Sequence, residues 1–317
     1  MSITVIIVNW NGGDLLLDCL KHLQDQSEPA ESILLMDNGS TDGSAKKAAL
    51  IPDVQVHFLN ENLGFAKANN LALEHCQTEW VALLNPDALA DKEWLANLRK
   101  AIQAYPDISF FGCQQRQLNF PDYLDGIGDE YHLSGLIWRK GYGKLVSNYK
   151  HQAPQPIFSP CACAALYKLN ALNAVGGFDE DFFCYVEDID LGFRLQLHDY
   201  HARYIPEAIV YHAGSASSGG THSDFSIYHG HRNLVWAFIK NMPSILFWTL
   251  LPLHIVLNII TIIYFSLKGQ GKIIIKAKYD ALLGIPKMWK KRHFIQNSKK
   301  ISSLKVWSLL HKKLISK

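Results

Sequence analysis

Asp87 stands at the point where an apolar run of the chain stops. Residues 81–84 have the length and composition of a strand that is covered on both faces, and Pro86 ends this strand because proline has no N–H to donate. Ligands of open α/β sheets collect at the carboxyl ends of the central strands. Asp87 therefore stands where a carboxylate can bind a hard divalent cation. Taken alone, Asp87 is more simply explained as the cap of a helix that begins near Asp91, but its neighbours in the sequence favour the site.

A second carboxylate, Asp37, ends another apolar run and precedes a loop of small residues. Its side chain could accept hydrogen bonds from ribose hydroxyls or from a pyrimidine N–H. Asn38 and Gly39 allow a ligand to approach the backbone closely. An ordinary turn, followed by a helix cap at Ser40 or Asp42, explains the same residues equally well.

Asparagine and glycine residues follow a third apolar run, in the segment 62–70. Gly64 leaves a helix start uncluttered there, and the free N–H groups and dipole of such a start favour anions. Lys67 could add a positive charge, although a solvated lysine is the simpler explanation. The chain has no G-x-G-x-x-G after its first predicted strand and no G-x-x-x-x-G-K-[ST], which argues against a dinucleotide dehydrogenase and against a P-loop enzyme.

The elements that must position these side chains alternate between strand and helix. Four segments of strand length predict strands at residues 3–8, 32–36, 54–59 and 81–84, of which the first and the last are expected to be buried. Leu and Cys residues at helical spacing predict a helix from about Asp14. The β-α repeat predicts an α/β chain with a doubly wound, mostly parallel, Rossmann-like sheet. Residues 116–156 lack a clear period and predict an excursion over the site, whereas 158–167 and 208–211 predict further strands.

Five motifs, in their order and spacing, resemble those of the family 2 inverting glycosyltransferases of GT-A fold: Asn9-Trp10-Asn11-Gly12, Asp37-Asn38-Gly39-Ser40-Thr41-Asp42, Asn62-Leu63-Gly64-Phe65, Asn85-Pro86-Asp87 and the segment from Phe182 to Leu191. Within the family, the chain is most similar to the rhamnosyltransferase-like branch that builds bacterial surface polysaccharides. The resemblance covers about residues 3–240. It implies transfer of a sugar from a nucleoside diphosphate, with inversion at the anomeric carbon.

The resemblance also implies a divalent metal, Mg²⁺ or Mn²⁺, at an aspartate motif. Asn85-Pro86-Asp87 departs from the usual D-x-D because asparagine stands first, which leaves Asp87 as the main metal carboxylate. His212 follows a predicted strand, at the place where the family often has a metal-binding histidine. The residues that the resemblance assigns to substrate binding are Asn9, Asn11, Asp37, Asn38, Gly39, Asn62, Gly64, Asn69, Asn85, Arg194 and Arg232.

Asp188 is the general base that the resemblance implies on the acceptor side, and Glu187 is its nearest competitor. Inverting transfer needs one carboxylate near the acceptor hydroxyl to accept its proton. Acidic residues in the first turn of a helix are also what the helix dipole alone would favour. Aromatic residues of the acceptor half, such as Tyr123, Tyr131 and Trp138, could stack on sugar rings, although packing roles explain them more simply.

The composition predicts one large α/β domain with an appendage. With 317 residues, 48% of them hydrophobic, the chain can bury a substantial core. The six cysteines form neither a disulfide framework nor a zinc motif, and no charged leader precedes the first strand, which together favour a reducing, cytosolic compartment. We expect a catalytic domain over 1–240, with a nucleotide-sugar half over about 1–115 and an acceptor half over about 116–240. A membrane-associated region then covers 241–317.

The C-terminal region combines an uncharged apolar stretch with a basic tail. No Lys, Arg, Asp or Glu occurs between Lys240 and Lys268. The last fifty residues carry fourteen Lys and Arg side chains and one acid, whereas the rest of the chain has 17 basic and 28 acidic residues. A single crossing of the membrane would place this positive tail outside, against the positive-inside tendency.

We therefore expect a re-entrant or interfacial helix pair that breaks at Pro252 and keeps the protein on the cytoplasmic face of the inner membrane, as a peripheral or monotopic protein. The tail cations assigned to anionic lipid are Lys287, Lys290, Lys291, Arg292, Lys299 and Lys300. A helical hairpin packed on the catalytic body is the alternative for a soluble protein.

Two functions from different classes remain open. The first is an inverting glycosyltransferase that uses dTDP-rhamnose or a UDP-hexose and a glycan or lipid-linked acceptor, with no nucleic-acid partner. The second is a non-catalytic scaffold that binds nucleotide sugars, against which the presence of Asp37, Asp87, Asp188 and His212 together argues. A sugar-1-phosphate nucleotidyltransferase is a weaker third candidate, since no glycine- and arginine-rich loop follows the first strand.

Overall fold

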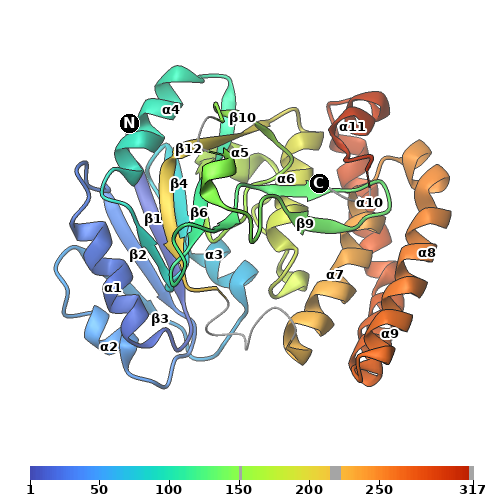
Figure 1. Ribbon diagram of the computed structural model, residues 1–317, viewed down its shortest axis with the longest axis horizontal. Helices are drawn as coiled ribbons and strands as arrows, with labels where there is room; N and C mark the ends of the chain where they lie inside the picture. The colour runs from blue at the N-terminus through green and yellow to red at the C-terminus, as the bar shows by residue number, and fades with distance from the viewer. Residues whose placement is uncertain (150–151, 215–222, 314–317) are drawn as a thin grey trace.

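A mixed sheet forms the centre of the molecule, and helices lie on both sides of it (Figure 1). The computed structural model describes residues 1–149, 152–214 and 223–313. Within this part of the chain the main sheet has ten strands. Its main path runs in the order β10-β12-β6-β11-β4-β1-β2-β3, while β5 pairs with β12 and β7 pairs with β6.

The first part of the chain alternates strands and helices, as the sequence predicts. Its strands are β1 (Ile3–Asn9), β2 (Ser32–Asp37), β3 (Val54–Phe58), β4 (Trp80–Leu84) and β5 (Ala88–Ala90). Its helices are α1 (Gly13–Gln24), α2 (Ser44–Ala48), α3 (Phe65–Leu73) and α4 (Trp94–Ala104). β1 pairs in parallel with β2 and β4, and β2 pairs in parallel with β3. The four predicted strands and the mostly parallel α/β sheet are therefore confirmed.

Separate hydrophobic cores lie on the two faces of this sheet. Ile3, Val5 and Ile7 of β1 pack with α1 and α4 on one face. Ile6 and Val8 pack with α3, α5 (Leu169–Ala174) and α6 (Glu187–Leu197) on the other. Because successive side chains of a strand point to opposite faces, a strand buried on both must be apolar at every position. This is why β4 is a continuous apolar run and β1 is apolar at every position from Val5 to Val8.

The acceptor half contributes more strands to the sheet than the sequence predicts. β6 (Ile108–Gln117) leads into this half, whose own strands are β7 (Leu124–Gly126), β8 (Asp129–Tyr131), β9 (Ile137–Arg139), β10 (Gln155–Ile157), β11 (Ala164–Lys168) and β12 (His201–His212). The prediction that 116–156 holds no sheet strand is wrong, since β7 and β10 join the main sheet and β8 and β9 form a hairpin. Two short 3₁₀ turns, Val146–Tyr149 and Glu180–Phe182, complete this half.

The structure adds one strand, β6, that the sequence did not predict, and it changes the bounds of two predicted strands. β6 pairs with β11 and β12 in the middle of the sheet, but its second half is polar and hides the strand in the sequence. The predicted strand 158–167 is wrong in its first half, because Pro160 and a turn from Cys161 to Ala164 delay the strand. Conversely, the predicted strand 208–211 is the end of the longer β12.

The C-terminal helices gather on one side of the sheet, at the right in Figure 1. They are α7 (Asp224–Asn241), α8 (Ser244–Leu267), α9 (Gly271–Leu283), α10 (Ile285–Ser298) and α11 (Ser303–Leu309). A third core joins them to the acceptor half through Tyr131, Phe158 and Phe193. The end of the described chain pairs with the β8–β9 hairpin, since the His311 N–H donates to Tyr131 O (2.8 Å) and the Leu133 N–H donates to His311 O (3.1 Å).

Helix α8 is continuous, so the predicted break at Pro252 is wrong. Proline removes one backbone hydrogen bond, and apolar packing on both sides of Pro252 holds the helix together. Phe247 and Leu250 are buried before the proline, and His254, buried after it, hydrogen-bonds Ser134 O at 2.7 Å. Within the described residues, α8 is the helix whose length and composition would allow it to cross a membrane, with a mean hydropathy of 2.1.

Part of the basic tail is engaged inside the molecule. The Lys291 ammonium pairs with Asp179 and Asp181, and Lys287 pairs with Asp181 at 2.6 Å. The Arg292 guanidinium is buried and donates to the carbonyl oxygens of Ile239 and Met242. The assignment of Arg292 and Lys291 to lipid is therefore wrong, because their charges are satisfied within the protein. The last four residues of the tail, 314–317, lie outside the described residues.

Candidate active site

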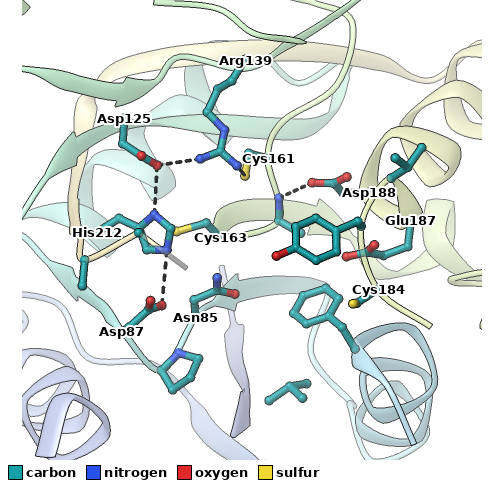
Figure 2. A pocket seen from close by; sticks show the side chains of 18 of the residues that line it. Asn85, Asp87, Asp125, Arg139, Cys161, Cys163, Cys184, Glu187, Asp188 and His212 are labelled. Carbon is teal, nitrogen blue, oxygen red and sulfur yellow. Dashed lines mark hydrogen bonds and ion pairs between the residues drawn. The ribbon is translucent and has the colours of Figure 1, made fainter. Parts of the chain in front are cut away.

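The carboxyl ends of β1 and β4 open on a cavity of about 1030 Å³, which the acceptor half closes from the other side. Figure 2 shows Asp87, His212 and Asp125 at one end, Glu187 and Asp188 at the other, and Arg139 and Cys161 between them. Eight of the residues predicted from the sequence line this cavity: Asn38, Asn62, Gly64, Asn85, Asp87, Glu187, Asp188 and His212. The cavity thus brings the two predicted halves of the chemistry together.

The loops after β1 and β2 are tied together by asparagine side chains. The buried Asn9 amide donates to Asp37 Oδ1 (3.0 Å), Ser40 Oγ (3.1 Å) and Ser44 Oγ (3.1 Å). The side-chain oxygen of Asn11 accepts from the Thr41 N–H at 2.8 Å. Asn9 and Asn11 therefore shape the loops and do not themselves line the cavity.

The loop after β3 is joined to the loop after β2 in the same way. Asn38 Nδ2 donates to Asn62 Oδ1 (2.9 Å), and Asn38 Oδ1 accepts from the Leu63 N–H (2.8 Å). Gly39 has φ +75°, and a Cβ there would lie 2.8 Å from the backbone of Glu61. Only glycine combines this conformation with this approach. The Asp37 and Asn62 loops therefore present one continuous surface to the cavity.

Gly64, in the loop after β3, lies against the loop that precedes α6. Its φ is +84°, and a Cβ would lie 2.5 Å from the ring of Phe183 and 2.7 Å from Phe183 O. The Ala66 N–H, in the first turn of α3, donates to the same carbonyl at 3.1 Å. The helix start that the sequence offers to an anion is therefore partly used by the protein's own backbone.

The side chains of Asp87 and His212 lie next to each other at the end of the sheet, where both could act as metal ligands. His212 Nε2 lies 3.3 Å from Asp87 Oδ1, and both side chains are buried. His212 Nδ1 hydrogen-bonds Asp125 Oδ2 at 2.9 Å, so the lone pair remains on Nε2 when Nδ1 carries the proton. Burial alone would lower the pKa of His212, but Cys163, Asp125 and Asp87 together raise that pKa well above its ordinary value.

A second group of possible ligand atoms lies between the two ends of the cavity. Side-chain atoms of Asp129, Cys161 and Asp188 lie within 4.8 Å of one another. The guanidinium of Arg139 faces this group, with Nη2 donating to Cys161 Sγ at 2.8 Å and Nε lying 3.9 Å from Asp129 Oδ1. Its Nη1 also pairs with Asp125 Oδ2 at 2.7 Å. A protein cation therefore already faces these carboxylates.

Asp188 and Glu187 open helix α6 on the far side of the cavity. Asp188 Oδ2 accepts a hydrogen bond from the Ala162 N–H (3.1 Å), and Asp188 Oδ1 accepts one from the Ile189 N–H (2.8 Å). Burial raises the pKa of Asp188, against the lowering effects of the Ala162 N–H and Arg139. Burial, followed by the charge of Asp188, raises the pKa of Glu187 well above its usual range. Oε2 of Glu187 has no hydrogen-bond partner among the described residues.

Four of the remaining predicted residues lie outside the cavity lining and have structural contacts. Arg194 pairs with Asp190 at 2.8 Å inside the protein. The Arg232 guanidinium donates to the carbonyl oxygens of Asp181 and Phe182. Asn69 donates to Phe65 O within α3 at 2.9 Å, and Asp37 is held by Asn9.

The sequence-based prediction missed several lining residues that the fold brings to the cavity. The charged ones are Asp125, Asp129 and Arg139, which lie on β7, β8 and β9. Their strands are three residues each, too short for a periodic signal. Of the three aromatic residues considered for stacking, Trp138 lines the cavity, whereas Tyr131 is fully buried in the core of the acceptor half. The Asp-x-x-x-Asp spacing of 125 and 129 is the one sequence signal that could have drawn attention to this segment.

Solved structures of glycosyltransferases share this fold. The S. aureus TarS 1-349 structure in complex with UDP-GlcNAc matches with a TM-score of 0.59 and 18% identity, covering 94% of this chain and 88% of that chain. The mannosyltransferase PcManGT from Pyrobaculum calidifontis, in complex with GDP-Man and Mn²⁺, matches with a TM-score of 0.56 and 20% identity, covering 93% and 85%. At such identities the likeness establishes the fold, which is the GT-A fold.

Sequence comparison establishes the family. The N-acetylglucosaminyl-diphospho-decaprenol L-rhamnosyltransferase of Mycobacterium tuberculosis (strain CDC 1551 / Oshkosh) is 28% identical over 238 residues, which cover 68% of this chain and 77% of the relative. The predicted resemblance to the rhamnosyltransferase-like branch is thereby confirmed. A sequence model of Glycosyl transferase family 2 matches residues 4–176, more than half of the chain, and the protein therefore belongs to this family of glycosyltransferases.

Proposed function

We propose that this protein transfers a sugar from a nucleoside-diphosphate donor to a hydroxyl of a glycan or lipid-linked acceptor, with inversion, in the synthesis of a surface polysaccharide. One observation carries the proposal: the Asp87–His212 pair and the carboxylate of Asp188 face one cavity from opposite ends (Figure 2). A donor diphosphate held at the first end leaves the anomeric carbon open to attack from the second.

The donor is proposed to be dTDP-rhamnose, with UDP-hexoses next. The relative from M. tuberculosis is named as an L-rhamnosyltransferase, and its name also specifies a diphospho-decaprenol acceptor. The loops after β2 and β3, joined through Asn38 and Asn62, offer amide and backbone groups for the nucleoside. A second, buried carboxylate beside them, Asp37, orders the loop from within.

The side chains at the metal end fit a divalent cation. His212 Nε2 belongs to a buried side chain and lies 3.3 Å from a carboxylate oxygen of Asp87, so the two ligand atoms are already close together. Asp125 holds the ring from behind, as carboxylates commonly do for metal-binding histidines. Asp87 and His212 would therefore hold Mg²⁺ or Mn²⁺, and a mixed oxygen and imidazole set suits Mn²⁺ well. When bound, such an ion stabilises the negative charge of the departing diphosphate.

Asp188 is proposed to accept the acceptor proton. As the acceptor oxygen bonds to the anomeric carbon, the bond from that carbon to the diphosphate breaks, and the nucleoside diphosphate leaves with the electron pair. The proton of the acceptor hydroxyl passes to the Asp188 carboxylate, which the N–H groups of Ala162 and Ile189 hold in place. Glu187 is buried beside it and has a pKa raised well above its usual range, which makes it the weaker candidate for a base.

Attachment to the cytoplasmic face of the membrane is proposed to occur through α8 and its neighbours. Only 22% of the most apolar part of α8 is buried in the protein. Large apolar side chains that remain exposed on the C-terminal helices are Ile245, Trp248, Ile255, Ile259, Ile263, Leu267, Leu282, Phe294 and Leu304. An exposed apolar surface flanked by lysines fits the headgroup boundary of an anionic bilayer. Lipid-linked acceptors are found at the same boundary.

Product formation tests this function. The purified full-length protein, with Mn²⁺, is incubated with a panel of nucleotide sugars and a lipid-linked sugar acceptor. We expect a new glycosidic bond whose anomeric configuration, read by NMR, is inverted relative to the donor. Retention of configuration would contradict the single-displacement chemistry. Donor binding without any transfer across the panel would instead favour the non-catalytic scaffold.

A further inference from the structure

The loop that leads into α6 has an unusual backbone. Phe183, Tyr185 and Val186 have φ values of 65°, 64° and 70°, and none of them is glycine. Side chains with a Cβ rarely adopt this left-handed conformation, and β-branched valine does so least. Such a backbone persists only where its surroundings hold it, and it concentrates at functional sites. The residues that hold this loop therefore affect where α6 begins.

Asn233 of α7 holds the loop from one side. Its side chain is fully buried, and Nδ2 donates to three carbonyl oxygens of the loop: Phe182 O (2.9 Å), Cys184 O (2.9 Å) and Tyr185 O (2.7 Å). An amide group carries two N–H bonds, so the three acceptors share them. The three carbonyl oxygens therefore converge on one amide group within the segment that carries the positive φ values.

The neighbouring Arg232 fixes the direction of the Asn233 amide. Arg232 Nε donates to Asn233 Oδ1 at 2.9 Å, which leaves Nδ2 directed at the loop. Arg232 Nη2 also donates to the carbonyls of Asp181 and Phe182, at 3.2 Å and 3.1 Å. The two adjacent residues together satisfy the carbonyls of most of the segment 181–185.

The opposite side of the loop contacts Gly64 and Ala66 of the nucleotide-sugar half. Phe183 O accepts from the Ala66 N–H at 3.1 Å, and the Phe183 ring packs where Gly64 has no side chain. The loop is thus fixed between α7 and the start of α3. Val186 is the residue before Glu187 and Asp188, so the direction of the backbone at Val186 sets where the first turn of α6 presents its carboxylates.

We propose that Asn233 is a positioning residue that holds the 182–186 loop in its left-handed path and thereby sets the place of Asp188 at the acceptor hydroxyl. The inference rests on the proposed function, because it assumes that Asp188 is the base. Asn233 itself does not line the cavity, so it acts through the loop. A misplacement of a catalytic group by about 1 Å can cost on the order of 100-fold in rate.

The experiment compares Asn233→Ala and Asn233→Asp with Asn241→Ala. Asn241 is a matched control, because it is an equally buried asparagine of the same helix whose Nδ2 donates to Asp190 Oδ1 (2.7 Å) and not to the loop. Asn233→Asp keeps the size and the acceptor for Arg232 but removes both donors. We expect kcat to fall by about 100-fold in both Asn233 variants and by only a few-fold in Asn241→Ala. The donor Kd, measured by calorimetry, should change much less than kcat in all three, since Asp87 and His212, which are proposed to hold the metal at the diphosphate, lie at the other end of the cavity.

Hydrogen exchange supplies a readout that does not depend on catalysis. Peptides that cover 182–187, and the Ala66 amide, should exchange faster in the Asn233 variants than in Asn241→Ala at equal thermal stability. Equal exchange in these peptides, or kcat losses that simply follow Tm in all three variants, would overturn the positioning role. A wild-type protein that transfers no sugar would instead contradict the proposed function, while the exchange result would still decide whether Asn233 holds the loop.

Discussion

His212 Nε2 lies 3.3 Å from Asp87 Oδ1, although the two residues belong to different halves of the chain. The antiparallel pairing of β5 with β12 explains the contact, because its register places His212 opposite Ala88, the residue after Asp87. The Ala213 N–H continues this pairing by donating to Asp87 O at 3.0 Å. The short strand β5, which follows Asn85-Pro86-Asp87, thus places Asp87 beside His212.

Loss of either side chain of this pair should remove metal-dependent donor binding. We expect Asp87→Ala and His212→Ala to weaken nucleotide-sugar affinity at least about tenfold in the presence of Mn²⁺, with little further loss on chelation. Calorimetry with and without a chelator measures the effect. His201→Ala changes a half-buried histidine at the start of the same strand, away from the cavity lining, and should leave the affinity unchanged. Wild-type affinity that is the same with and without metal would rule out a metal role for Asp87 and His212.

Asp188→Asn should stop transfer without stopping donor binding. Asparagine keeps the size of the side chain and its acceptor for the Ala162 N–H, but it cannot take up a proton. Loss of a general base typically costs about 10²–10⁴-fold in rate. Glu187→Gln serves as the control and should reduce kcat less. If Glu187→Gln is inactive while Asp188→Asn transfers sugar normally, the base is Glu187; if neither matters, it lies elsewhere.

The pH dependence of transfer should reflect the burial of Asp188. Burial raises the pKa of Asp188 above its ordinary value, while Arg139 works in the opposite direction. The base acts in its deprotonated form, so kcat/KM should fall as the pH drops through a value above the usual aspartate range of about 4. Arg139→Gln removes the cation and should move this acidic limb to higher pH. Lys140→Gln, which removes the neighbouring cation paired with Glu130, should leave the limb in place, and a limb that stays fixed in Arg139→Gln would contradict the assignment.

Membrane binding should depend on the exposed face of α8. Ile255 and Ile259 are each 50% exposed and lie one helical turn apart. The double change Ile255→Glu and Ile259→Glu should abolish sedimentation of the full-length protein with anionic liposomes, because each places a charge at the apolar boundary. Leu50→Glu alters an exposed leucine far from α8 in the chain, in the loop after α2, and this variant should bind as the wild type does. Unchanged binding of the double variant would exclude α8 as the attachment surface.

Point substitutions are the right test of this surface, because removal of 241–317 would also remove part of the core. Met288, Val306 and Leu310 of the C-terminal helices pack in the same cluster as Phe158 and Phe193. Protease protection in inverted vesicles then tests the topology. A tail that is shielded inside the vesicle lumen would mean that α8 crosses the membrane.

The sequence predicted best where a single local pattern determines the structure. Mostly apolar runs identified β1, β2 and β4, because strands buried on both faces have few polar positions. β3 differs, since its sequence alternates apolar and polar residues and it is only partly buried. The residues directly after these strands, Asn38, Asn85 and Asp87 among them, were predicted for the site because parallel strands end at one edge. The opening of α6 was found in the same way, from acidic residues before an apolar period.

The positive φ values of the 182–186 loop could not be predicted from the sequence. The sequence around Val186 does not predict a φ of +70°, because valine disfavours that conformation. The packing of α7 brings the Asn233 amide to the loop, where it donates to Tyr185 O and holds the backbone in this conformation. The same applies to Pro252, which locally predicts a break but lies in a helix held by buried side chains on both sides.

The amino-acid sequence alone therefore specifies the class of sheet, the family, the polar strand end that carries Asp87 and the acidic helix start that carries Asp188. The partners of these carboxylates emerge only from the folded chain: His212 for Asp87, and Ala162, with Arg139 nearby, for Asp188. The physical reason is that local periodicity reports burial, whereas these contacts depend on how strands far apart in the chain are paired. Short strands such as β5, β7 and β9 set that pairing and leave almost no periodic signal of their own.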